Sequence, residues 1–155
     1  VGQDADASHC FQETFLEAVR LARAQRVDNW PALLRHLATA RALDLLRVRY
    51  RTNRRLEPLV DLEAVVGRMA RPPEEAMAEE LAHRLRQALA QLPAQQAEVF
   101  CLSCLEQWTH AEIGGRLQMT ANAVGVVLYR ARQRLRELLE PVDVRSVPEE
   151  RGSQS

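Results

Sequence analysis

The sequence has no lysine, no long apolar run and few aromatic residues. All 21 basic residues are arginine, and aromatic residues make up 5% of the 155 positions. The planar guanidinium of arginine suits phosphate contacts, although a GC-rich genome would give the same bias. No apolar run approaches the roughly 20 residues that span a membrane, and no signal peptide opens the sequence. We therefore expect a cytoplasmic protein without membrane insertion.

Signatures of enzymes and of metal sites are also scarce. The sequence has no glycine-rich phosphate loop, no nucleophile elbow and no paired histidine or acid motif, so we expect no enzymatic activity and no cofactor. An odd number of cysteines argues against a disulfide framework. Cys101 and Cys104, with His83 and His110 nearby in sequence, leave zinc as an alternative. Because the pair is predicted to lie mid-helix on an apolar side, we expect buried free thiols and no metal.

The composition predicts a helical, globular protein. The chain is 46% hydrophobic, and its length suits one medium domain or two small ones. The formal net charge is zero, which argues against tight, indiscriminate nucleic-acid binding. We predict an all-α fold of two small helical domains, residues 1–55 and 76–141, joined by a linker over 56–75. A disordered tail is predicted over 142–155.

Apolar periodicity places the helices and their buried faces. The first helix is predicted from about Ser8 to Arg26, and its apolar face comprises Phe11, Phe15, Leu16, Val19 and Ala22. The second is predicted to run from an Asn29 cap to about Tyr50, and to bury Leu33, Leu34, Leu37, Ala38, Ala42, Leu45 and Leu46. In the second domain the predicted core comprises Leu81, Leu85, Ala88, Leu89, Leu92, Ala97, Phe100, Cys101, Cys104, Leu105 and Trp108.

Residues 109–136 carry two helices joined by a tight turn. Thr109 can cap the first helix and Glu112 can complete a capping box, while Thr120 can cap the second helix. The stripe that the second helix should bury comprises Val124, Val127, Leu128, Ala131, Leu135 and Leu138. This pattern predicts a helix-turn-helix, whose second helix can enter a DNA major groove, although a plain helical hairpin shows the same stripes.

Three motifs in this stretch resemble a known family. Ala111-Glu-Ile-Gly114, Thr120-Ala-Asn-Ala-Val124 and Leu128-Tyr-Arg-Ala-Arg-Gln-Arg-Leu-Arg136 resemble the C-terminal domain of bacterial RNA polymerase sigma factors. The resemblance is to the extracytoplasmic-function class of the sigma-70 family, and residues 89–100 are similar to that domain's entry helices. It implies a region 4-like, winged-helix-like domain. Core RNA polymerase and promoter DNA would be partners, with an anti-sigma factor as a further candidate.

The resemblance assigns contacts with an upstream promoter element to the second helix. The residues expected to face the groove are Thr120, Ala121, Asn122, Ala123, Gly125, Val126, Tyr129 and Arg130. Arg130, Arg132 and Arg134 are expected to reach phosphates. Family members often carry Lys or Arg where this chain has Gly125 and Val127, so we expect base reading to rest on Asn122, on Tyr129 and on DNA shape.

Two N-terminal segments also resemble sigma factors. Residues 6–18 are similar to the segment that grips the clamp of the polymerase, and this resemblance nominates Asp6, Gln12, Glu13 and Leu16 as contacts, with Phe11 and Phe15 mainly packing. Residues 34–47 are similar to the helix that opens the downstream element. The nominated downstream DNA contacts are Asn29, Trp30, Arg41, Arg47, Arg49, Arg51, Arg54 and Arg55. Because sigma factors carry a further helix or two before this segment, we expect the N-terminal domain to be incomplete.

The sequence therefore predicts a sigma factor that binds core polymerase and directs promoter-specific initiation. Two alternatives stay open. A stand-alone helix-turn-helix regulator would bind DNA without polymerase and would normally dimerise on a two-fold site. An interaction module would bind polymerase or an anti-sigma factor without supporting a transcript.

Overall fold

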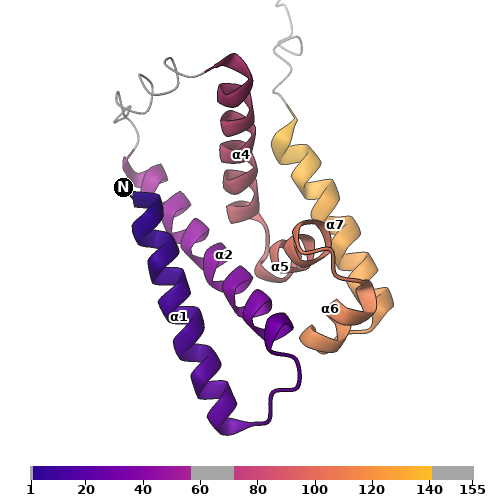
Figure 1. Cartoon of the computed structure of the whole chain (residues 1–155). Coiled ribbons are helices and arrows are strands. Elements are labelled where there is room, and N and C mark those ends of the chain that lie inside the picture. Colours follow the sequence, from indigo (N-terminus) through magenta and orange to yellow (C-terminus); the bar gives the residue numbers. More distant parts are fainter. Residues whose placement is uncertain (1, 57–71, 141–155) are drawn as a thin grey trace, which may run out of the picture.

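A computed structural model describes residues 2–56 and 72–140 (Figure 1). Its elements are α1 Gly2–Ala24, α2 Trp30–Leu56, α4 Pro73–Gln91, α5 Ala94–Phe100, the π-helical turn η1 Cys101–Leu105, α6 His110–Leu117 and α7 Ala121–Leu139. No strand occurs in these two ranges, so the predicted all-α fold is confirmed. No helix in them is long and apolar enough to cross a membrane. The predicted tail over 142–155 and most of the predicted linker lie outside the described residues.

Helix α2 lies at the centre of the arrangement (Figure 1). Its neighbours are α1 on one side and α4 and α5 on another. One apolar cluster joins Leu43 of α2 to residues of α4, α5, η1 and α7, namely Ala88, Leu89, Leu92, Ala97, Cys101, Ala131 and Leu135. A second cluster forms the interior of the helix-turn-helix from Val99, Leu102, Trp108, Ile113, Val124 and Leu128. Helix α2 therefore shares a core with the C-terminal helices.

The predicted apolar face of α1 is wrong. Phe11 and Phe15 are 71% and 58% exposed, and Leu16 is also exposed. The helix instead buries Thr14 and Ala18, one turn apart, against α2. Small side chains at a helix contact let the two backbones approach closely, so this packing leaves the large apolar residues outside. The helix also begins at Gly2, six residues before the predicted start at Ser8.

The predicted buried face of α2 is right only in part. Leu33 is buried, but Leu34, Ala38 and Ala42 are exposed, and Leu43 is buried without having been predicted. The reason is that α2 packs on two sides at once, so its buried residues do not follow a single stripe. The helix also continues to Leu56, past the predicted end near Tyr50.

The core of α4 and α5 is largely as predicted, with two exceptions. Ala88, Leu89, Leu92, Ala97, Cys101 and Trp108 are buried. Leu81 is exposed in the middle of α4, and Leu105 is 61% exposed. At η1 the Glu106 N–H donates to the Cys101 carbonyl at 3.1 Å, which is the i to i+5 pattern of a π-helix. The wider turn rotates Leu105 off the stripe that α-helical spacing predicts.

Helix α7 matches its prediction closely. Val124, Leu128, Ala131 and Leu135 are buried, and Val127 and Leu138 are partly buried. The far end of the helix is tied to α4, because Arg84 Nη2 donates to the Leu139 carbonyl at 2.7 Å. That bond satisfies one of the last carbonyls of α7, which have no partner inside the helix. The long helix is therefore held at both ends, by α6 and by α4.

Candidate nucleic-acid interface

The corner between α6 and α7 is built from two threonine caps and one left-handed residue. Thr109 Oγ1 accepts from the Glu112 N–H at 3.2 Å, and Thr120 Oγ1 accepts from the Ala123 N–H at 3.1 Å. Both predicted N-caps are confirmed. Gln118 ends α6 in the left-handed conformation, with φ 57° and ψ 47°, which turns the chain sharply. These local features fix the direction in which α7 leaves the turn.

Gly114 is the residue that lets α6 and the turn come together. A Cβ at this position would lie 2.5 Å from the carbonyl oxygen of Met119. The Met119 N–H in turn donates to the Gly114 carbonyl at 2.9 Å. The neighbouring Gly115 has nothing within 4 Å of the same built atom. Of these adjacent glycines, only Gly114 is required by the geometry of the corner.

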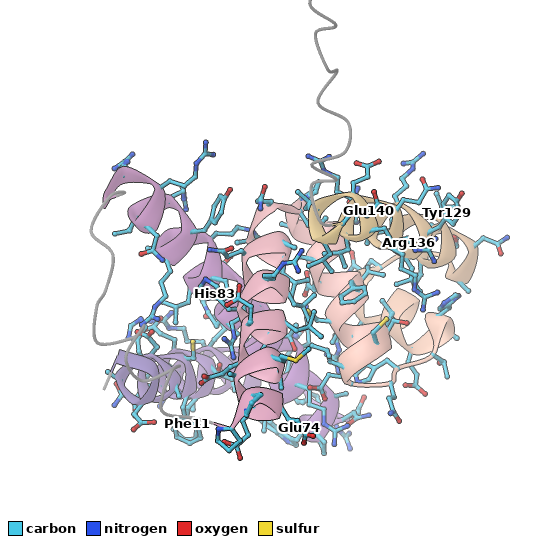
Figure 2. All side chains as sticks on the ribbon, turned by 90° about the horizontal axis from the view of Figure 1, so that it is seen from above. Phe11, Glu74, His83, Tyr129, Arg136 and Glu140 are labelled. Carbon is cyan, nitrogen blue, oxygen red and sulfur yellow. The ribbon has the colours of Figure 1, made fainter. Side chains whose placement is uncertain are left out.

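The outward face of α7 is an uncharged stripe. Asn122, Val126, Tyr129 and Gln133 repeat at spacings of three and four residues, and they lie on the helix side opposite the buried Val124, Leu128 and Leu135. Val126 is 50% exposed and Tyr129 is 62% exposed. In Figure 2, Tyr129 and Arg136 lie along α7 at one edge of the molecule, and Phe11 lies towards the opposite edge. We call these four residues the outward stripe.

Arginines border the outward stripe on both sides. Helical periodicity puts Arg130 and Arg134 on one side and Arg132 and Arg136 on the other. All four are exposed. Arg134 Nη1 donates to Glu137 Oε2 at 2.9 Å, and Arg132 Nη2 lies 3.7 Å from Cys104 Sγ. A helix with uncharged side chains in the middle and cations along both edges suits a groove between two phosphate backbones.

Two contacts shape this surface further. Gln133 Nε2 donates to the Tyr129 hydroxyl at 2.7 Å. This bond restrains the Tyr129 ring against Gln133, which lies one turn further along the outward face of α7. The ring of His110 lies beside Gly125, where an added Cβ would be 3.7 Å from it, an ordinary contact. The remaining nominated residues of the helix start, Thr120 and Ala121, are exposed, and Ala123 is partly exposed. The nominated upstream contacts, from Thr120 to Arg134, therefore extend over most of the length of α7.

The nominated downstream contacts are spread along α2. Asn29 caps this helix, since its Oδ1 accepts from the Ala32 N–H at 3.1 Å, and Trp30 beside it is exposed. Arg51, Arg54 and Arg55 are exposed at the other end, about 36 Å away at 1.5 Å per residue. Asn29 also borders a groove of about 530 Å³ between the start of α2 and α6.

Three of the nominated arginines form ion pairs within the protein. Arg41 Nη2 lies 3.9 Å from Glu17 of α1, and Arg47 Nη1 lies 3.1 Å from Asp44. Arg49 forms an ion pair with Asp6 of α1. That pair joins a nominated DNA contact to a nominated polymerase contact. Arg54 is placed over the Tyr50 ring, 5.8 Å from its centroid. The terminal arginines of α2 are therefore the better exposed part of the set.

The nominated polymerase contacts of α1 differ in their exposure. Gln12 and Leu16 are exposed, Glu13 is partly exposed, and Asp6 is held by Arg49. Phe11 and Phe15, which sequence reasoning treated as packing residues, stand on the same outer surface. Their exposure is the feature that the sequence pattern missed, because an amphipathic pattern does not say which neighbour a helix meets.

The cysteines do not assemble a metal site in the described ranges. No group of three or more His, Cys, Asp or Glu side chains within 2–56 and 72–140 is placed to hold an ion. Cys101 is buried and Cys104 is partly exposed. Burial raises the pKa of the Cys101 thiol from 9.0 to about 11, and the nearby Cys104, Glu106 and Glu98 add to the shift. The thiol is therefore protonated at neutral pH.

A comparison with known families agrees with the geometry of this corner. Residues 82–135 match the family described as sigma-70, region 4. The match begins in α4, covers α5, η1 and α6, and ends within α7 at Leu135, the last buried leucine of that helix. The match shows that the C-terminal helices are similar to sigma-70 region 4.

Proposed function

We propose that this chain is a sigma factor of the extracytoplasmic-function class, which binds core RNA polymerase and directs initiation at specific promoters. The observation that carries the proposal is the outward face of α7, an uncharged stripe bordered by arginines, inside the segment that matches sigma-70 region 4. On this proposal residues 76–141 form the upstream-binding domain and residues 1–55 form the domain for polymerase and downstream DNA. Such a protein acts in the cytoplasm and has no enzymatic activity of its own.

In the proposed complex, α7 lies in the major groove of the upstream element. The nominated residues near its N-terminus would face the bases, as is typical of recognition helices. These are Thr120, Ala121, Asn122, Ala123, Gly125, Val126 and Tyr129. Arg130, Arg132 and Arg134 would contact phosphates on either side. Phosphate contacts fix register and orientation but carry no sequence information, so the uncharged residues between them would set the specificity.

The N-terminal half would contribute downstream DNA and polymerase contacts. Arg51, Arg54 and Arg55 at the exposed end of α2 suit a phosphate backbone, with Asn29 and Trp30 at the opposite end of the helix. Arg41, Arg47 and Arg49 would have to exchange their present ion pairs for phosphates. The outer face of α1, with Gln12, Leu16 and the exposed Phe11 and Phe15, suits an apolar partner surface on the polymerase.

The charge balance supports a function that depends on a partner. With zero formal net charge, the chain has little long-range attraction for DNA. Only the local arginine rows favour phosphates, and each neutralised phosphate adds to affinity in a salt-dependent way. We therefore expect weak DNA binding by the isolated chain and firm, sequence-specific binding once polymerase supplies the remaining contacts.

Run-off transcription tests the proposal. Purified core polymerase is supplied with genomic fragments, with and without the chain, and the transcripts are sequenced. Transcripts that require the chain are expected, and Tyr129→Ala on the outward stripe should reduce them while Arg86→Ala on the exposed side of α4 should not. Co-elution with polymerase but no transcript would favour the interaction module. Tight binding to a two-fold site without polymerase would favour a stand-alone regulator.

A further inference from the structure

The residues that α7 offers to DNA in its first two turns carry no charge. From Ala121 to Tyr129 the exposed side chains are those of Ala121, Asn122, Val126 and Tyr129, and the first arginine of the helix is Arg130. The commonest specific contact in the major groove is arginine or lysine to guanine, and carboxylates accept from cytosine. Neither group is present in these two turns. The chemistry left for reading bases is one amide, one branched apolar group and one phenol.

Asn122 is suited to adenine. It is the second residue of α7 and is exposed, so its amide is free of the helix interior. An asparagine amide has a donor and an acceptor side by side, which matches N6–H and N7 of adenine in the major groove. The Thr120 cap and the Gln118 turn fix the backbone from which this side chain extends. A short side chain on a fixed backbone discriminates better than a long flexible one.

Val126 is suited to the methyl group of thymine. It lies one turn after Asn122 on the outward stripe and is 50% exposed, although an apolar side chain gains nothing from water. Thymine is the base that presents an apolar group in the major groove, and apolar side chains contact it there. Four residues of helix rise about 6 Å, while base pairs rise about 3.4 Å, so the two contacts would fall one or two base pairs apart.

We propose that α7 reads an A·T-containing site, with Asn122 on an adenine and Val126 on a thymine methyl one or two base pairs away. The inference rests on the proposed function, because it names the bases that the same helix recognises. The arginine rows contribute affinity that is indifferent to sequence. Tyr129, which accepts a hydrogen bond from Gln133, lies next to Arg130, where the contacts with phosphates begin.

The test begins with duplexes selected from a randomised library by the complex of the full chain with core polymerase. In the selected duplex each thymine is replaced singly by deoxyuridine, which removes only the methyl group, and each adenine by 7-deazaadenine, which removes only N7. One deoxyuridine is expected to weaken binding about fourfold, the effect of one buried methyl group. One 7-deazaadenine is expected to weaken binding about tenfold.

Each effect should depend on one side chain. Val126→Ala should abolish the response to deoxyuridine and keep the response to 7-deazaadenine, and Asn122→Ala should do the reverse. Val126→Thr keeps a methyl group and the same shape, so it should retain the response to deoxyuridine. Both positions are exposed, so thermal unfolding of these variants should match that of the wild type.

Two results would overturn the inference, and they differ from each other. If the selected site is G·C throughout the α7 footprint, or if the analogue responses persist in the alanine variants, the base assignment is wrong while DNA binding stands. If selection enriches no sequence at all, the proposed function fails and the base assignment fails with it.

Discussion

Two adjacent glycines in α6 should respond in opposite directions to the same substitution. A methyl group at Gly114 would lie 2.5 Å from the Met119 carbonyl oxygen, so the turn would have to move by roughly 1 Å to reach an ordinary contact. The obstacle is backbone, which cannot rotate aside as a side chain does. At Gly115 nothing lies within 4 Å, so an added methyl group meets only solvent.

The magnitudes follow from two opposing effects. Replacing a helical glycine by alanine stabilises a helix by up to about 1 kcal/mol, which applies at both sites. Forcing atoms into an occupied space costs about 1–3 kcal/mol, or more where backbone must shift, which applies only to Gly114. We expect Gly115→Ala to raise the free energy of unfolding by up to about 1 kcal/mol, and Gly114→Ala to lower it by about 2 kcal/mol.

Urea and thermal unfolding followed by far-UV circular dichroism measure the difference. For a chain of this size about 1 kcal/mol shifts Tm by roughly 2–4 °C, so the two variants should differ by about 6 °C or more. Gly114→Ala should also weaken DNA binding by the polymerase complex, because the turn sets the direction of α7. Equal unfolding temperatures for the two variants, or a more stable Gly114→Ala, would refute the close approach of α6 to the turn.

Four further predictions concern α4, η1 and α7. Arg130→Ala should weaken DNA binding by a similar factor for every selected sequence and lower the salt slope by about one, measured by fluorescence anisotropy against Arg86→Ala; a loss confined to one base pair would contradict a phosphate contact. Arg84→Ala removes the bond to the Leu139 carbonyl and should lower the free energy of unfolding in urea by about 1–2 kcal/mol, and an unchanged urea midpoint would show that the bond is not stabilising. The buried Cys101 should react with iodoacetamide at pH 8.5 far more slowly than the partly exposed Cys10 and Cys104, as mass spectrometry would show. Because the folded Cys101 thiol keeps its proton while the unfolded thiol ionises, this thiol should not change the free energy of unfolding below about pH 9 and should lower it as the pH rises from about 9 to 11. The loss of stability over that range should be smaller in Cys101→Ala than in the wild type, and equal losses in the two proteins would contradict the shift.

How far the sequence predicts this fold depends on how many neighbours each helix has. Helix α7 packs its buried stripe on one side and exposes the other, so helical periodicity and the Thr120 cap were enough to place it. Helix α2 has neighbours on two sides, and periodicity identified Leu33 but missed Leu43. Helix α1 buries the small Thr14 and Ala18, so a search for large apolar residues selected its outer face. Periodicity and capping residues determine where a helix lies in the sequence, whereas the neighbouring helices determine which of its sides is buried.

The candidate site also combines features that the local sequence predicts with features that depend on neighbouring elements. The caps and the outward positions of α7 depend on residues close in sequence, and they were predicted correctly in position. The ion pair between Arg49 and Asp6 joins residues of two helices, so the local sequence around either residue does not predict it. The importance of Gly114 depends on a carbonyl five residues away across a turn, and the displacement of Leu105 depends on one π-helical turn. Each needs the three-dimensional path of the backbone.

Photo-crosslinking tests the central claim, that the outward stripe of α7 lies on promoter DNA. A benzophenone amino acid is placed at Tyr129, or at Arg86 as the matched exposed control, and the chain is assembled with core polymerase on a promoter recovered by run-off transcription. We expect a crosslink from position 129 to DNA upstream of the start site and none from position 86. Crosslinks from position 129 to polymerase subunits alone, with no DNA adduct, would contradict it.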